Sequence, residues 1–139
     1  MAQLDVPARS RLMARIRSKN TTPEKTVRHL LFSIGYRYRI HRKDLPGNPD
    51  IVFFSRHKAI FINGCFWHQH PECNRATIPA TNRDYWISKL ERNRTRDKKA
   101  IRALQLLGWS VLTLWECELS NVKQLRRKIT QFLGPCRFF

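Results

Sequence analysis

The sequence predicts an α/β fold with a mixed central sheet flanked by helices. Segments with apolar residues at helical spacing alternate along the chain with short apolar or alternating runs typical of strands. The 139 residues suffice for one domain with a buried core, and a hydrophobic fraction of 42% agrees with a globular chain. No internal repeat or low-complexity linker divides the sequence. The predicted order is helix, hairpin strands, helix, strand and helix.

The N-terminal segment is expected to differ from the rest of the chain. Residues 1–20 are predicted to form a basic arm, and residues 21–139 are predicted to form a single domain. Met13 and Ile16 give the arm a slight helical spacing, although a partly ordered tail would show the same pattern.

The first helix is predicted to start at Thr22. Threonine can cap a helix, Pro23 fits the first helical position, and Glu24 favours the positive end of the helix dipole. Apolar residues then recur on one helical face until Gly35 ends the helix; they are Val27, Leu30, Leu31 and Ile34.

Three strands are predicted to follow. Apolar and basic residues alternate over residues 36–40, which is the pattern of a strand with one buried face. After a turn at Pro46-Gly47, residues 51–54 form an apolar run, and residues 59–62 form a second run that pairs with the first through a short loop.

The second half of the chain begins with an irregular polar segment, residues 65–81. A long helix is predicted over residues 84–107, with Leu104 and Leu107 closing its apolar face before Gly108. Residues 109–115 are predicted to form the last strand, and residues 122–133 the last helix.

The charge of the chain favours a polyanionic partner. Its 27 Lys and Arg against 10 Asp and Glu give a net charge of +17, which is typical of nucleic-acid-binding proteins. The sequence contains no recognisable secretory signal and no apolar run long enough to span a bilayer. A cytoplasmic protein without a membrane partner is therefore expected. Its four cysteines are expected to be thiols or metal ligands rather than disulfides.

A structural zinc site is predicted from Cys65, His70 and Cys73, with Cys117 far downstream. Thiolates and imidazole are preferred ligands of Zn²⁺, and four of them complete a tetrahedral site. The alternative is that Cys117 is only a small buried residue. Cys136 is expected to be a spare cysteine.

The candidates for a catalytic centre are three carboxylates and one histidine. Asp50 follows Pro49 at the head of an apolar strand, where a rigid carboxylate suits a hard cation such as Mg²⁺, although a simple turn residue looks the same. Glu24 adds a carboxylate, unless it only complements the helix dipole. Histidine exchanges protons near neutral pH, so His68 is a candidate general acid or base, and Asp97 can orient it.

The aromatic residues of the polar loop and the long helix admit two interpretations. Phe66 and Trp67 either wedge between DNA base steps or pack beneath the zinc loop. Trp86, Lys89 and Asn93 share one face of a strongly basic helix, which suits either the reading of a duplex or an ordinary solvated cationic surface.

Taken together, these motifs resemble those of the very-short-patch repair endonucleases, which nick DNA beside T:G mismatches left by deamination of 5-methylcytosine. The resemblance covers roughly residues 9–119 and is most specific in Gly64-Cys65-Phe66-Trp67-His68, with Pro49-Asp50 upstream and Trp115-Glu116-Cys117 downstream. It implies a core like that of type II restriction enzymes and a Mg²⁺-dependent nicking reaction on double-stranded DNA with a T:G mismatch. Mismatch-repair proteins are further candidate partners, and a monomer is expected.

The resemblance also implies roles for individual residues. Asp50 would bind Mg²⁺ together with the backbone carbonyl of Ile62, and the catalytic residues would be Asp50, His68, Asp97 and Glu24. The structural zinc ligands would be Cys65, His70, Cys73 and Cys117. The DNA contacts would be Phe66, Trp67 and Trp86 beside the mismatch, Met13 from the other groove, and Lys89 and Asn93 on the mismatched pair.

The chain departs from the family pattern at two places. Asn63 stands where the best-known form of the family carries a second histidine, and an amide cannot act as a base near neutral pH. His68 or a metal-bound water must then carry the acid–base work. The strand over residues 59–62 also lacks the Glu-x-Lys pair of many restriction enzymes. The site is therefore poor in carboxylates and is expected to use the substrate phosphate to complete the metal shell.

Two other classes of function remain open at this point. The first is a zinc-bound DNA-binding module without catalysis, against which the joint presence of Asp50, His68 and Asp97 argues. The second is an RNA-binding or ribosome-associated basic protein, which the charge alone would also allow.

Overall fold

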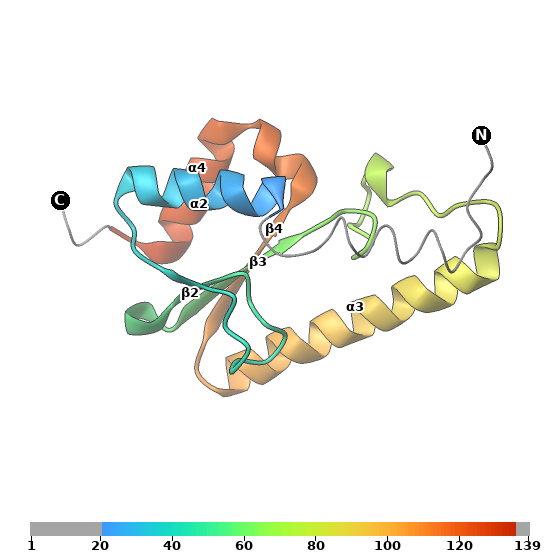
Figure 1. Cartoon of the computed structure of the whole chain (residues 1–139), viewed down its shortest axis with the longest axis horizontal. Coiled ribbons are helices and arrows are strands. Elements are labelled where there is room, and N and C mark those ends of the chain that lie inside the picture. Colours follow the sequence, from blue (N-terminus) through green and yellow to red (C-terminus); the bar gives the residue numbers. More distant parts are fainter. Residues whose placement is uncertain (1–20, 136–139) are drawn as a thin grey trace.

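The computed structural model describes residues 21–135, and these form a mixed α/β fold as the sequence predicts (Figure 1). Its helices are α2 (Thr22–Ile34), α3 (Arg83–Leu106) and α4 (Val122–Leu133). Its strands are β1 (Arg39–Ile40), β2 (Ile51–Phe53), β3 (Lys58–Asn63) and β4 (Ser110–Trp115). Three short 3₁₀ turns complete the fold: η1 (Phe54–Arg56), η2 (Asn74–Ala76) and η3 (Glu116–Ser120).

The four strands form one sheet in the order β1-β2-β3-β4. The first three strands are antiparallel, and β3 pairs with β4 in parallel, so that α3 makes the crossover between them. His57 makes the tight link between η1 and β3 possible, because its left-handed backbone (φ 52°) lets its N–H donate to the Phe54 carbonyl at 3.2 Å.

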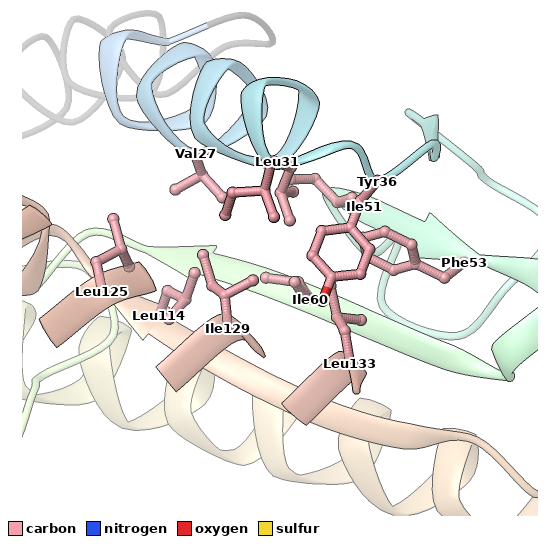
Figure 2. Close-up of a cluster of buried hydrophobic side chains, with 11 residues drawn as sticks. Val27, Leu31, Tyr36, Ile51, Phe53, Ile60, Leu114, Leu125, Ile129 and Leu133 are labelled. Carbon is pink, nitrogen blue, oxygen red and sulfur yellow. The ribbon is translucent and has the colours of Figure 1, made fainter. Parts of the chain in front are cut away.

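Helices cover both faces of this sheet. On one face, α2 and α4 enclose the larger core, where Leu31 and Ile129 meet Ile51, Ile60 and Leu114 of the strands (Figure 2). On the other face, the end of α3 packs on the sheet through a smaller core, made by Val52, Ala59, Leu104 and Trp109. Successive strand residues alternate between the two cores, as the pleat of a strand requires.

The start of α2 and the first strand differ slightly from the prediction. Thr21 is the N-cap, rather than Thr22, and its Oγ1 accepts the Glu24 N–H at 3.5 Å. The first strand has two residues instead of five. Gly35 ends α2 in a left-handed conformation, and the Tyr36 N–H donates to the Leu31 carbonyl at 3.0 Å, which turns Tyr36 into the core.

The bounds of α3 and α4 agree with the prediction to within a residue, but one side chain was misassigned. Leu107 was expected to close the apolar face of the long helix, and it is 61% exposed. The helix ends one residue earlier, and the Trp109 N–H donates to the Leu104 carbonyl at 3.0 Å. The chain turns there, so that Trp109 covers Leu104 and Leu107 points outward.

The segment between β1 and β2 packs closely on α3 through Gly47. This glycine has a φ of +75°, and a Cβ at its position would lie 2.5 Å from the Cβ of Ala100. A side chain therefore does not fit there, and the contact fixes the approach of the segment that leads to Asp50.

Within residues 21–135, no helix is both long and apolar enough to cross a membrane.

Candidate active site

A cleft of about 920 Å³ lies on the α3 side of the sheet, between the N-terminus of α2, the end of β3 and the middle of α3. Residues far apart in the sequence meet there, because β3 and β4 end at the same edge of the sheet. All four residues predicted to be catalytic line this cleft. Its carboxylates are Glu24, Asp50, Asp97 and Glu116, so the expectation of a site poor in carboxylates was wrong for the cleft as a whole.

Asp50 stands at the head of β2 and is held by the neighbouring strand. Its Oδ2 accepts the backbone N–H of Ile62 at 2.7 Å. The register Ile51↔Ile60 places Asp50 opposite Phe61, so its side chain belongs to the α3 face of the sheet. The predicted pair for Mg²⁺, Asp50 and the backbone of Ile62, is thus in contact through the Ile62 N–H.

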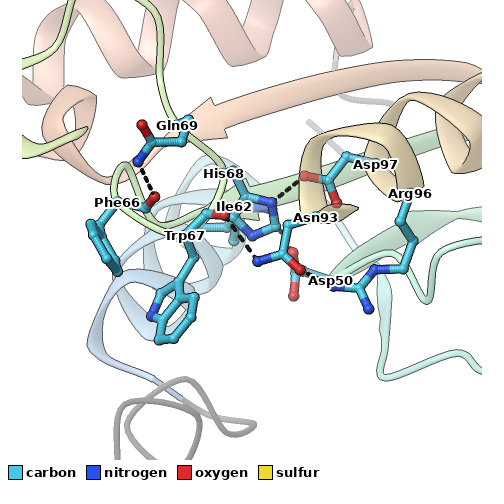
Figure 3. A network of polar contacts seen from close by, with 9 residues as sticks. All are labelled: Asp50, Ile62, Phe66, Trp67, His68, Gln69, Asn93, Arg96 and Asp97. Atoms are coloured by element: carbon cyan, nitrogen blue, oxygen red, sulfur yellow. Dashed lines mark hydrogen bonds and ion pairs between the residues drawn. The ribbon is translucent and has the colours of Figure 1, made fainter. Parts of the chain in front are cut away.

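His68 and Asp97 form a hydrogen-bonded pair at the wall of the cleft. His68 lies in the turn after β3, where its backbone N–H donates to the Gly64 carbonyl at 3.2 Å. Its ring Nδ1 contacts Oδ2 of Asp97 on α3 (Figure 3). The orientation of His68 by Asp97, which the sequence predicts, is therefore present in the structure.

Glu24 enters the cleft from the first turn of α2. Its Oε2 lies 3.7 Å from Nε2 of His41, a residue with a left-handed backbone just after β1. Glu24 therefore contacts a histidine as well as lying at the positive end of its helix. No local sequence pattern indicates this contact, because it joins two elements that are brought together only by the fold.

The four predicted zinc ligands converge beside the cleft. One ligand atom each from Cys65, His70, Cys73 and Cys117 lies within 4.8 Å of the others. Nδ1 of His70 is 3.7 Å from Sγ of Cys65 and 3.4 Å from Sγ of Cys117. The His70 ring stacks on Trp115 with centroids 4.2 Å apart, which fixes its orientation. Cys117, the distant fourth ligand of the prediction, is therefore part of the group.

The thiols of this group differ in their electrostatic environment. Burial raises the pKa of the Cys65 thiol to about 12. The backbone N–H of Arg75 lowers the pKa of Cys73. A buried thiol that resists ionisation needs a cation before it becomes a thiolate, and soft sulfur and imidazole ligands suit zinc. The residues present therefore fit a bound metal ion.

The predicted DNA-wedging aromatics form a cluster of their own. Trp67 and Trp86 are 6% and 1% exposed, and they pack with Phe66 and Leu90. The centroids of Phe66 and Trp67 are 5.3 Å apart in an edge-on arrangement. In Figure 3 the Phe66 and Trp67 rings point away from Asp50 and Asp97. The alternative in which these rings pack as a core describes this structure, and a role in wedging stays a prediction.

Comparison with known proteins identifies the family. A family model described as DNA mismatch endonuclease Vsr matches residues 1–75. The type II nicking enzyme V.XorIIP of Xanthomonas oryzae pv. oryzae is 52% identical over 130 residues, which cover 93% of this chain and 95% of that protein. The DNA mismatch endonuclease Vsr of Escherichia coli is 40% identical over 121 residues, which cover 87% of this chain and 77% of that protein. The chain belongs to the Vsr family.

Membership of the Vsr family makes this chain a DNA endonuclease. A further relative, the type II nicking enzyme V.NmeAIP of Neisseria meningitidis, is 42% identical over 125 residues, covering 90% of this chain and 89% of that protein. The resemblance drawn from the sequence motifs is therefore confirmed. Membership of a DNA endonuclease family argues against both rival classes considered above.

Two residues predicted to read the mismatched pair support the aromatic cluster in this Vsr-family structure. Nζ of Lys89 lies 5.2 Å from the Trp67 ring centroid and 5.9 Å from that of Trp86. Asn93 is 7% exposed, and it donates to the Trp67 carbonyl at 3.3 Å and accepts from Arg96 at 2.7 Å. Their role in base reading stays a prediction, since these contacts engage both side chains within the protein.

The cleft also contains residues that were not assigned to the site from the sequence. They are Arg96 and Glu116, and Asn63, which the sequence placed at the position of the family's second histidine, lines the cleft as well. Arg96 could have been assigned to the site from the sequence, because it lies three residues after Asn93 and one before Asp97 on the same predicted helix. Glu116 directly precedes Cys117, but only the parallel pairing of β3 and β4 brings it to the cleft. Met13 and Cys136 lie outside the described residues.

Proposed function

We propose that this chain nicks one strand of double-stranded DNA beside T:G mismatches that arise from deamination of 5-methylcytosine. The observation that carries the proposal is the meeting of Asp50 with the His68–Asp97 pair in one cleft of a Vsr-family chain. A carboxylate and an oriented histidine are the groups that metal-assisted phosphodiester hydrolysis needs.

Magnesium is the cofactor that this cleft fits best. Carboxylate and carbonyl oxygens are its preferred ligands, and four carboxylates line the cleft. We assign Mg²⁺ to Asp50 and the Ile62 carbonyl. When bound, the ion would neutralise charge on the scissile phosphate and lower the pKa of a coordinated water. The Ile62 N–H holds the Asp50 carboxylate in position for this role.

The chain's own residues organise proton transfer at the phosphate. Asp97 contacts Nδ1 of His68 and thereby fixes the ring and its tautomer. Proton exchange with the attacking water then takes place at Nε2 of His68. The cut leaves a 5′-phosphate. Glu24, at the N-terminus of α2, adds negative charge to the same cleft, where it favours a divalent cation over a monovalent one.

The second metal is proposed to be a structural zinc ion held by Cys65, His70, Cys73 and Cys117. A closed set of four protein ligands is typical of structural rather than catalytic zinc. The group joins the irregular segment after β3 to η3 after β4. Zinc would therefore hold the turn that carries His68 against the sheet.

We further infer a core of the type II restriction-enzyme kind, within a single domain over residues 21–139 that follows a basic arm over residues 1–20. A mixed four-stranded sheet with helices on both faces, and an aspartate at the head of a central strand, support this inference. Phe66 and Trp67, which pack together in the free protein, are proposed to leave that cluster on binding and to enter the base stack beside the mismatch, where unstacking costs least.

The proposal is tested with a labelled duplex that contains one T:G mismatch in a methyltransferase recognition sequence. We expect a single nick on the thymine strand in Mg²⁺, no cut in EDTA, and no cut in the matched C:G duplex. Treatment of the nicked product with DNA ligase checks for the 5′-phosphate, because the ligase reseals only a nick that carries one. The matched variant Asp97→Asn keeps the shape of the side chain and should slow nicking. Equal cutting of the matched and mismatched duplexes would contradict the proposed mismatch specificity.

A further inference from the structure

Asn63 is the last residue of β3 and faces the candidate active site. Strand alternation places Ile60 and Ile62 on the α2–α4 core, and Phe61 on the α3 side. Asn63 therefore shares the α3 face with Phe61 and with Asp50, which lies opposite Phe61. The side chain is 8% exposed and lines the cleft.

The side chain of Asn63 is largely buried, and its amide is accessible from the cleft. Among residues 21–135, no side-chain hydrogen bond involves it, whereas the other buried asparagine, Asn93, uses both its amide nitrogen and its amide oxygen. Polar side chains that are mostly buried usually find a hydrogen-bond partner, so an amide that reaches a cleft without one keeps its donors available. An amide of this kind at the wall of a cleft indicates a ligand that supplies the missing partner.

The backbone on either side of Asn63 is tied to the two catalytic groups. The N–H of Ile62 donates to the Asp50 carboxylate, and the carbonyl of Gly64 accepts from the backbone N–H of His68. A phosphate bound between Asp50 and His68 would therefore lie beside the end of β3, where Asn63 is located. The amide neither titrates nor carries charge, but its Nδ2 can donate two hydrogen bonds.

We propose that Asn63 donates a hydrogen bond from Nδ2 to a non-bridging oxygen of the scissile phosphate. This inference rests on the proposed nicking function. The carboxylates of the cleft repel a phosphate, and Arg96 and a fixed neutral donor both oppose that repulsion; the donor does so without changing its own charge with pH. Because charge on the non-bridging oxygens is stabilised in the transition state by positioned donors, Asn63 is a catalytic residue of the electrostatic kind rather than an acid or base.

The test compares wild type with Asn63→Ala on three mismatched duplexes in Mg²⁺. One has an ordinary scissile phosphate, and the other two carry the two phosphorothioate diastereomers at that position. We expect Asn63→Ala to lower kcat on the ordinary duplex by roughly 10–100-fold, with binding changed less than about threefold. On one diastereomer, whose sulfur accepts hydrogen bonds poorly, the same substitution should cost less than about fivefold. Gln131→Ala removes an exposed amide from α4 and serves as the matched control.

A purely structural role for Asn63 would lower the rate by the same factor on all three duplexes, and that result would overturn the inference. Wild-type kcat in Asn63→Ala would overturn it as well. Asn63→Asp has the same shape, removes the donor and adds a negative charge, so it should be slower than Asn63→Ala; an equal or faster rate contradicts the proposed contact. If wild type itself does not nick the mismatched duplex, the proposed function fails, and the inference fails with it.

Discussion

Hydrogen bonds from neighbouring elements help to position the reacting side chains. Asp50 depends on the Ile62 N–H, and His68 depends on Asp97. Neither Asp50 nor Asp97 belongs to a buried hydrophobic cluster. Substitutions at these two positions should therefore change the chemistry more than the stability.

Asp50→Ala is predicted to retain DNA binding and lose nicking. The carboxylate is the proposed ligand of Mg²⁺, so its loss should lower kcat by more than about 100-fold, while the basic surface that binds the duplex is unchanged. Gel-shift and nicking assays on the same mismatched duplex measure the two effects. Asp44→Ala is the control, since Asp44 is an exposed carboxylate paired with Arg42. Near wild-type nicking by Asp50→Ala in Mg²⁺ would make the metal assignment wrong.

Substitutions of Trp67 and Phe66 distinguish a role in core packing from a role in DNA insertion. Trp67 is 6% exposed, so Trp67→Ala is predicted to cost about 3–5 kcal/mol of unfolding free energy. Denaturant unfolding measures this cost. A wild-type melting curve for Trp67→Ala would show that the ring is not part of the core and would favour its insertion between bases.

Phe66 is only partly buried, and Phe66→Ala is predicted to lose less stability than Trp67→Ala. If Phe66 stacks beside the mismatch, the variant loses roughly 1–3 kcal/mol of base stacking, and nicking of the T:G duplex falls sharply while binding to matched DNA changes little. Discrimination between T:G and C:G equal to that of wild type would end the wedge hypothesis for Phe66.

Elements with a continuous pattern in the sequence were predicted well. The bounds of α4 match the prediction because its apolar face is regular and Asn121 caps it. The first strand was overestimated, since the alternation of Tyr36 and Tyr38 with arginine looks the same whether or not the chain pairs with β2. The two adjacent threonines at the start of α2 could not be told apart as caps by propensity alone.

The segment between β1 and β2 gives a prediction at the scale of elements. Gly47→Ala adds a Cβ at 2.5 Å from the Cβ of Ala100, and Gly108→Ala adds one with nothing within 4 Å, although both glycines have positive φ. Both variants lose roughly 1–2 kcal/mol to the left-handed backbone. Gly47→Ala should lose about 1–3 kcal/mol more through overpacking. Equal losses of stability, measured by denaturation, would mean that the segment moves away from α3 without cost.

The segment between β3 and α3 gives a second prediction at this scale. Purified protein is expected to contain zinc in a one-to-one ratio, and Cys73→Ser is expected to lower solubility more than it lowers the rate of the soluble fraction. Chelation should lower Tm by more than about 5 °C, given that each kcal/mol lost lowers Tm by roughly 4 °C in a domain of this size. Elemental analysis without zinc would contradict the assignment.

Charge dominates the behaviour of the whole molecule. The net charge of +17 attracts the duplex, and each phosphate neutralised contributes about −0.9 to the slope of log affinity against log salt concentration. A slope steeper than about −4 is therefore predicted for binding to a mismatched duplex. Titration from low to high salt measures it, and a flat titration would show that the basic residues do not contact the DNA backbone.

The residues of the candidate site were predictable from the sequence only where they belong to short motifs with a recognisable residue type and spacing. Asp50, His68 and the four candidate metal ligands were singled out from residue type and spacing, and the structure brings those four ligands together. The contact of Glu24 with His41 and the open amide of Asn63 depend on how strands and helices meet, so no local pattern reveals them. Sequence order also could not show that Trp86 and Asn93 would be buried on a helix this basic.

The crossover through α3 has a consequence for the order of events during folding. His68 precedes this helix, Asp97 lies on it, and Cys117 follows it, while β4 joins β3 only after the helix has crossed the sheet. Parallel pairing across such a long separation closes late, because the entropy of the loop must be overcome first. A newly synthesised chain therefore carries its positive charge from the start. We expect the cleft to be complete only when β4 has paired with β3, because Glu116 and Cys117 follow that strand.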